Sequence, residues 1–148
     1  MKNKQIFSYL MISVGITMIF LGARWLIVDE PWMLDEVANV ERLEMTFDEL
    51  FQPDVNRTLP GYLRQIYRFF GLWVVIIGFF IVSFSSPTLI VQNIIRKRIL
   101  FCFGIMMIMG TILGYALIPS SHFIYLMWIM NVLYVFSIYN HIKINDEK

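Results

Sequence analysis

Four long apolar segments, separated by polar stretches, dominate the pattern of residues along the chain. They run over residues 6–28, 62–84, 99–118 and 123–142. Each holds about the 20 mainly apolar residues that a helix needs to cross the hydrocarbon core of a bilayer. A backbone in lipid must satisfy its hydrogen bonds within its own segment, and the alternating pattern of barrel strands is absent. The sequence therefore predicts an all-α protein whose four transmembrane helices form an antiparallel bundle.

The composition agrees with a single integral membrane domain over residues 1–148. Hydrophobic residues make up 58% of the chain and charged residues 16%, whereas soluble domains carry about 25% charged residues. The net charge of +1 gives no general attraction to nucleic acid, so we expect no such partner. The first segment is too long for a signal peptide and no small-residue cleavage site follows it, so we interpret it as an uncleaved anchor.

Lysine and arginine residues in the short connections predict the orientation. Lys2 and Lys4 precede the first span, residues 96–98 (Arg-Lys-Arg) lie between the second and third, and Lys143 and Lys148 follow the fourth. All of these positions fall on one side of a chain with four spans, and basic residues are enriched on the cytoplasmic side. We therefore expect a multi-pass protein of the plasma (inner) membrane with both termini in the cytoplasm.

The connection over residues 29–61 differs from the rest, because it holds nine of the chain's 11 acidic residues. Pro31 suits the first turn of a helix, and Thr46 with Glu49 fits a capping box. One apolar stripe can be formed by Met33, Leu34, Val37, Val40 and Leu43. We expect short amphipathic helices across the outer mouth of the bundle. With no histidine and no calcium-loop spacing, the carboxylates are better interpreted as a solvated face than as a metal site.

Three arginines near the outer ends of the first two spans form the candidate outer polar site. Arg24 lies in the first span, and Arg64 and Arg68 lie one turn apart in the second. In one interpretation the arginines reach lipid phosphates or hold the loop through ion pairs. In the other they line a pocket for an anion or lipid headgroup. The candidate carboxylate partners belong to Glu30, Asp35 and Glu36.

Polar and small residues inside the spans suggest further contacts. Asn131 is the deepest strongly polar side chain, with Tyr134 close by on the same helix. An interhelical hydrogen bond is the simpler interpretation of Asn131, and contact with a small molecule in the bundle is the alternative. Cys102, the only cysteine, lies in an apolar run, so we expect a buried, inert thiol.

Glycines predict where helices approach closely. Gly15 and Gly22 are seven residues apart in the first span, and Gly71 and Gly78 are seven apart in the second. Each pair presents one small-residue face, which permits close packing of helices.

No catalytic constellation is visible in the sequence. His122 and His141 fall at opposite faces of the membrane by the predicted topology, and there is no phosphate loop or serine–histidine–acid set. The spans contain no acidic residue, which argues against a proton-coupled exporter and makes a transporter the weakest functional class. We therefore expect a protein that is not an enzyme and that holds neither a metal nor a cofactor.

The stretch from Tyr62 to Gly78, YLRQIYRFFGLWVVIIG, combines an aromatic, arginine-containing start with a glycine-spaced apolar helix. It resembles the start of the second helix in small four-helix membrane proteins of the DoxX-like group, and the length and four-span layout are also similar. The resemblance implies a compact four-helix bundle, sometimes associated with membrane redox or stress systems. It transfers no catalytic residue to this chain.

Two functional hypotheses follow. The leading one is a non-enzymatic membrane protein that binds a lipid or a membrane-protein partner through its outer loop and arginine cluster. The alternative is a bundle that holds a quinone or lipid-like molecule near Asn131 and Tyr134, as a redox-associated subunit would.

Overall fold

The computed structural model describes residues 2–146, and four long helices account for most of them. They are α1 (Lys2–Ile27), α4 (Leu59–Phe84), α5 (Asn93–Leu117) and α6 (Phe123–Asp146). Residues 2–146 contain no β-strand. Each long helix is apolar enough and long enough to cross a membrane, so the predicted all-α fold with four such helices is confirmed. Lys148, used above for orientation, lies outside the described residues.

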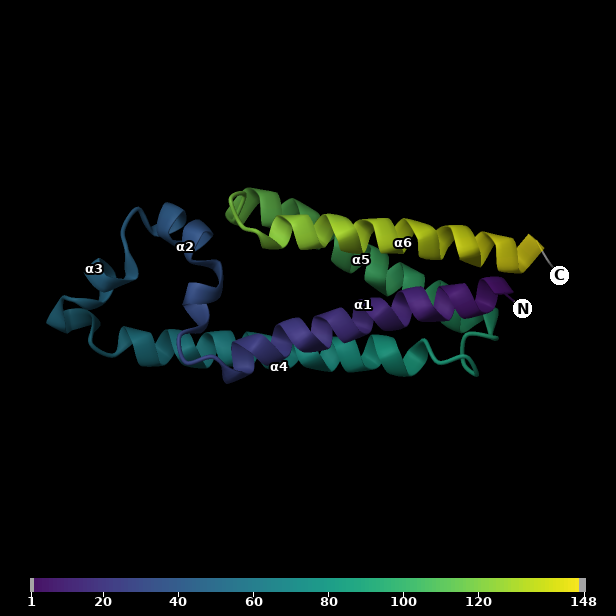
Figure 1. Ribbon diagram of the computed structural model, residues 1–148, viewed down its shortest axis with the longest axis horizontal. Helices are drawn as coiled ribbons and strands as arrows, with labels where there is room; N and C mark the ends of the chain where they lie inside the picture. Colours follow the sequence, from purple (N-terminus) through teal and green to yellow (C-terminus); the bar gives the residue numbers. More distant parts are fainter. Residues whose placement is uncertain (1, 147–148) are drawn as a thin grey trace.

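Short helices fill the connection between α1 and α4, and we call residues 29–58 the cap. The cap contains η1 (Pro31–Asp35), α2 (Glu36–Leu43), α3 (Phe47–Phe51) and η2 (Asp54–Asn56). The capping box of α3 is confirmed, because Thr46 Oγ1 accepts from the Glu49 amide and the Glu49 carboxylate accepts from the Thr46 amide. Figure 1 shows the cap at one end of the bundle, the cap end, with both termini at the opposite, terminal end.

Backbone-to-backbone packing joins α1 to α4. A Cβ atom added to Gly78 would lie 2.7 Å from the carbonyl oxygen of Gly15, and one added to Gly71 would lie 2.7 Å from that of Gly22. These distances are below any normal contact, so only glycine fits at the crossing. The small-residue faces predicted from the sequence therefore face each other.

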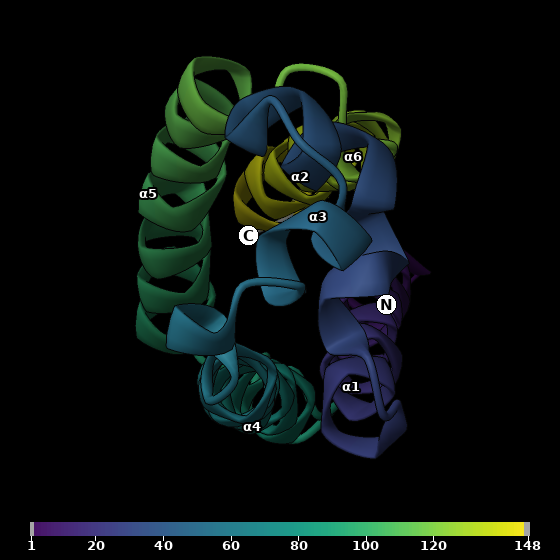
Figure 2. The same ribbon diagram turned by 90° about the vertical axis from the view of Figure 1, so that its left-hand side faces the viewer.

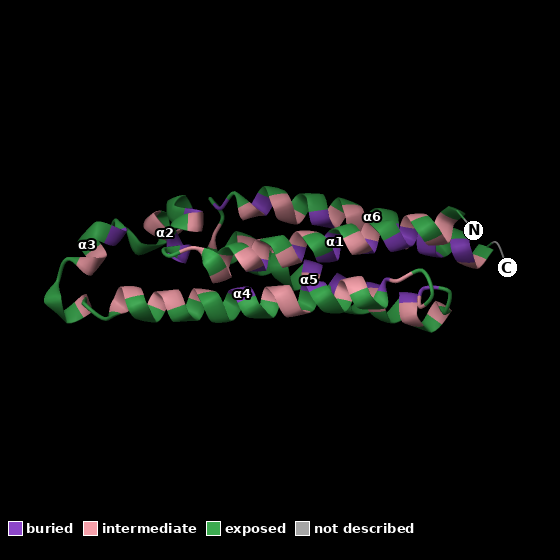
Figure 3. Cartoon of the chain, turned by 60° about the horizontal axis from the view of Figure 1, so that its bottom comes forward, coloured by how far each residue is buried: buried purple, intermediate pink, exposed green. Residues whose placement is uncertain are grey.

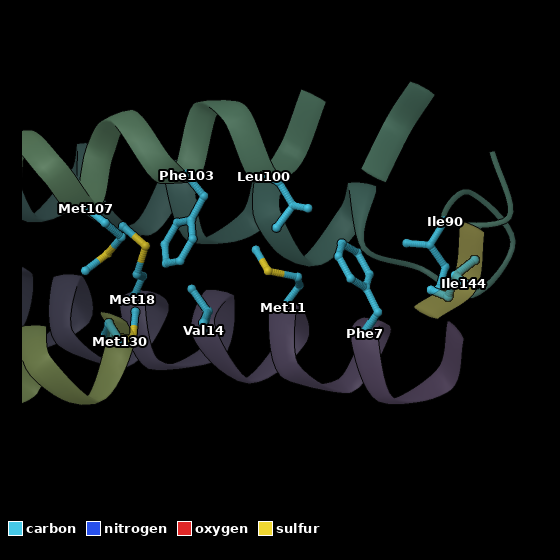
Figure 4. Packing of buried hydrophobic residues seen from close by; sticks show 10 residues of the cluster. All are labelled: Phe7, Met11, Val14, Met18, Ile90, Leu100, Phe103, Met107, Met130 and Ile144. Carbon is cyan, nitrogen blue, oxygen red and sulfur yellow. The ribbon is translucent and has the colours of Figure 1, made fainter. Parts of the chain in front are cut away.

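The buried core lies between α1, α5 and α6 (Figure 4). Its members are Phe7, Met11, Val14 and Met18 of α1, Leu100, Phe103 and Met107 of α5, Met130 and Ile144 of α6, and Ile90 of the α4–α5 connection. The buried residues of α4 are its two glycines. Most of its length is exposed or partly exposed in Figure 3, which suits a helix surrounded by acyl chains.

Helix α5 runs obliquely across the bundle. At the cap end it lies beside α6, and toward the terminal end it approaches α4 (Figures 1 and 2). It begins at Asn93 rather than at residue 99, because the basic residues before the apolar run continue the helix. Residues 96–98 are therefore helical, and each of the three side chains points in a different direction.

The glycine contact makes a direct prediction about stability. The variant Gly78→Ala should lower the free energy of unfolding by about 1–3 kcal/mol, because the added methyl group meets backbone atoms that cannot move aside. Unfolding of the detergent-solubilised protein, followed by circular dichroism, measures the change. Gly110→Ala is the matched control, because a Cβ at Gly110 meets nothing within 4 Å. Equal stability of the two variants would contradict the proposed close contact.

Candidate functional site

The glycine contacts fix the register of α1 against α4 at the cap end. Since Gly22 meets Gly71, residue 24 lies opposite residue 69, and Arg24 and Arg68 share one level of the bundle. Arg64 lies one turn nearer the cap, where its Nε donates a 2.7 Å hydrogen bond to the carbonyl oxygen of Asp29. The three arginines thus lie near one end of the helix pair, at similar heights.

Arg24 nevertheless points in a different direction from the other two arginines. Arg64 points toward the end of α1, as its hydrogen bond shows. Arg24 follows Gly22 by two residues, so its side chain points away from α4. It is exposed on the same face of α1 as Phe20 and Ile27. The structure does not bring the three guanidinium groups into one pocket.

The candidate carboxylates do not pair with these arginines. Within residues 2–146, neither Arg24 nor Arg64 nor Arg68 lies within ion-pair distance of a carboxylate. Glu30 and Glu36 are exposed, and hydration of an exposed charge competes with pairing. Ion pairs from the arginines therefore do not hold the cap in place.

Asp35 faces the α5–α6 connection instead. Its side chain is 11% exposed, and Oδ1 lies 3.3 Å from Nδ1 of His122 without hydrogen-bond geometry. Helix η1 has about three residues per turn, so Trp32 and Asp35 both turn inward, and Ala38 of α2 is buried as well. The predicted apolar stripe is wrong, since Val37 is 69% exposed. The buried carboxylate of Asp35 therefore lies against the α5–α6 connection.

The cap has an aromatic core of its own. The ring of Trp32 packs edge-on against Phe51, with 5.5 Å between centroids, and contacts Phe47 at 6.1 Å. The amide of Asn39 donates to the Trp32 carbonyl oxygen at 2.8 Å and to the Tyr67 hydroxyl of α4 at 3.2 Å. The cap is therefore a folded segment attached to α4 as well.

The predicted intramembrane polar residues bond to protein partners. Asn131 donates to Oγ1 of Thr111 in α5 at 3.2 Å and to the Met127 carbonyl oxygen at 3.1 Å. The hydroxyl of Tyr134 donates to the Leu100 carbonyl oxygen at 3.1 Å. These contacts fix α6 against α5. They agree with the simpler interpretation of Asn131, an interhelical hydrogen bond. The polar groups that would orient a ligand between these helices are already in use.

Sequence reasoning missed the most deeply buried charge, the guanidinium of Arg96. This side chain is 0% exposed. Its donors bond the carbonyl oxygens of Ile90 (2.6 Å) and Val91 (3.0 Å), Oδ1 of Asn145 (3.1 Å) and Asn93 (3.4 Å), and Nδ1 of His141 (3.2 Å). We call these residues the Arg96 node. None of the partners is a carboxylate.

The Arg96 node connects three parts of the terminal end: the α4–α5 connection, the start of α5 and the end of α6. His141 is a neutral imidazole here, because a ring nitrogen that accepts a hydrogen bond carries no proton. All five N–H groups of the guanidinium are engaged, which offsets the large cost of removing the charge from water. With no donor left for a ligand, the node is a structural connection.

A groove of about 350 Å³ lies between α4 and α5 near the terminal end. Its lining comes from α4 between Ile77 and Phe84 and from α5 between Ile95 and Met106. The lining is apolar apart from Arg98 and the thiol of Cys102. Lys97 is exposed and takes no part in the groove.

The position of Cys102 corrects an expectation from the sequence. The thiol is exposed along the groove, whereas its apolar neighbours suggested burial. In a membrane helix, an apolar neighbourhood in the sequence marks a lipid-facing side as readily as a core side. The thiol is therefore a natural reporter of whatever occupies the groove.

Metal chemistry finds no support in the geometry. Over residues 2–146, no three histidine, cysteine, aspartate or glutamate side chains gather as a metal site requires. His122 lies at the cap end beside Asp35, and His141 lies at the terminal end beside Arg96. The two histidines therefore belong to separate sites.

Comparison with known proteins adds no relative: no family model, no curated protein and no solved structure matches this chain.

The Arg96 node makes a prediction about stability. Arg96→Gln should lower the free energy of unfolding by about 3 kcal/mol, because it leaves buried carbonyl and imidazole acceptors without donors. Lys97→Gln is the control, and its exposed side chain should change stability by less than about 0.5 kcal/mol. Chemical unfolding in detergent measures both. Equal effects of the two substitutions would show that Arg96 acts only through its charge.

The capping box makes the start of α3 sensitive to pH. Hydrogen bonds from the Thr46 amide and hydroxyl lower the pKa of Glu49 below its ordinary value. The contribution of Glu49 to stability is therefore complete above its ordinary pKa and is lost as the pH falls through the lowered pKa. Protection of the α3 amides against hydrogen exchange should fall in acid. In Glu49→Gln, which keeps a capping partner, protection should not depend on pH, and an identical acid loss would contradict this.

Proposed function

We propose that this protein is a non-enzymatic membrane protein that binds a lipid-like small molecule in the groove between α4 and α5. The groove carries the proposal, because its volume of about 350 Å³ falls within the range of about 300–1,000 Å³ that is typical of ligand pockets. Its lining is almost wholly apolar, with one cation and one thiol. Such a surface suits a hydrophobic molecule with one polar end.

The proposal moves the ligand away from the bundle centre that the sequence suggested. Asn131 and Tyr134 are occupied by bonds to α5. The groove lies between two transmembrane segments, and its lining residues Phe80 and Phe84 are exposed on a surface that acyl chains would cover. A ligand would enter from the bilayer rather than from water, and no catalytic group is needed to hold it.

The proposal includes the predicted placement in the plasma membrane. The four spans form an antiparallel bundle with the termini in the cytoplasm and the cap outside. Supporting this, basic residues collect at the terminal end, where Lys2, Lys4, Lys97, Arg98 and Lys143 lie, as cytoplasmic ends do. The resemblance to DoxX-like proteins makes a quinone one member of the ligand class.

A second candidate function is partner binding by the cap. The observation that favours it is a folded cap whose exposed acidic side chains, such as Glu30, Glu36 and Glu41, are not used in ion pairs within residues 2–146. A membrane-protein partner with a basic outer surface would suit this face. The α4–α5 groove would then be filled by bulk lipid alone.

Reaction of Cys102 with a maleimide tests the proposed function. In detergent micelles, adding a short-chain quinone or a short-chain phospholipid should slow the labelling of Cys102 at least threefold. The control is a thiol introduced by Ile108→Cys on the Cys102→Ser background, because Ile108 is 59% exposed and lies outside the groove. Its labelling should not change. Equal slowing of both thiols, or of neither, would overturn groove binding.

A further inference from the structure

We infer that the groove takes an anionic phospholipid, with one acyl chain between α4 and α5 and the phosphate at Arg98. This inference rests on the proposed function and names the chemical class of the ligand. It also names the residue that would recognise the headgroup.

Arg98 has no anionic partner among residues 2–146. Residues 55–145 contain no aspartate or glutamate, so neither α4 nor α5 supplies a carboxylate. No ion pair forms at Arg98 within residues 2–146. Arg98 is exposed, as Lys97 is, so its guanidinium at the edge of the apolar groove is accessible to an anion from outside the protein. A guanidinium can bind phosphate through two parallel hydrogen bonds.

The neighbouring residue Arg96 is a contrasting case within the same helix. Arg96 is fully buried and uses all of its donors within the protein. Lys97 is exposed away from the groove. Of the three consecutive basic residues, Arg98 alone lines the groove, so the chain places one cation where a ligand headgroup would be.

The groove has the length and polarity of one lipid leaflet. From Ile95 to Met106 the helix rises about 16 Å, which is roughly half of the ~30 Å hydrocarbon core. Arg98 lies toward the terminal end of this stretch, and the side chains deeper in the groove are apolar apart from the Cys102 thiol. A phospholipid has the same order, with its anionic headgroup at the surface and its acyl chain inside.

The basic character of the whole terminal end also favours a negatively charged ligand. Basic residues dominate there, and basic sites between transmembrane helices on the cytoplasmic side are a recurrent mode of binding anionic headgroups. A quinone would fill the apolar part of the groove but would leave the guanidinium without a counter-charge. An anionic phospholipid satisfies both parts of the site.

Native mass spectrometry of the full chain tests the inference. The protein is equilibrated in micelles with equal amounts of phosphatidylglycerol and phosphatidylcholine, and the retained lipid is counted. We expect one phosphatidylglycerol to be retained in preference to phosphatidylcholine, and Arg98→Gln to reduce that preference about tenfold, the effect of one charged contact. Lys97→Gln, which removes the same charge one residue away, should change it less than about twofold.

Labelling of Cys102 in parallel micelle samples, each containing only one of the two lipids, locates the lipid. Phosphatidylglycerol should protect the thiol in the native chain and in Lys97→Gln, and should lose this effect in Arg98→Gln. If both lipids protect Cys102 equally and Arg98→Gln changes nothing, the headgroup inference fails while groove binding stands. If neither lipid nor a short-chain quinone protects Cys102, the proposed function fails as well. Equal losses in Arg98→Gln and Lys97→Gln would show general surface attraction and overturn the inference.

Discussion

The contact on which the rest of the structure depends is the backbone-to-backbone packing of α1 against α4. It places Gly15 against Gly78 and Gly22 against Gly71, with no side chain between them. As a consequence, the side of α4 that faces the bundle carries glycine at its buried positions. The core is then built by α1, α5 and α6 (Figure 4). Helix α4 is held chiefly through α1, and its contact with α5 is left open enough to form a groove.

At the terminal end, the Arg96 node joins the α4–α5 connection to the start of α5 and the end of α6. The guanidinium bonds the carbonyl oxygens of Ile90 and Val91 in the α4–α5 connection and side chains near the end of α6. At the same end, Ser8 of α1 donates to the carbonyl oxygen of Ser85, just after α4. Polar contacts at the terminal end therefore hold the α4–α5 connection against α1 and α6.

Local patterns in the sequence predicted the long helices, the capping box at Thr46 and the glycine faces, because each depends on neighbours within a turn or two. The wrong predictions concern which side of a helix faces the rest of the protein, and tertiary packing determines this. Pro31–Asp35 winds as a 3₁₀ helix, which turns Asp35 inward and Val37 outward. Cys102 was placed in the core because lipid-facing and core-facing sides are equally apolar in a membrane helix. The outward position of Arg24 could have been found from its spacing to Gly22.

The run Arg96-Lys97-Arg98 shows that a count of basic residues predicts the membrane topology but not the environment of each side chain. Successive helical residues point about 100° apart, so three adjacent cations enter three environments. Arg96 is satisfied by neutral oxygen and nitrogen acceptors that the fold brings together from distant positions in the chain. Arg98 faces an apolar groove in a stretch without any carboxylate. Arg98 is exposed at the edge of the groove and Arg96 is buried and fully bonded, so the proposed headgroup contact falls on Arg98 and not on its neighbour.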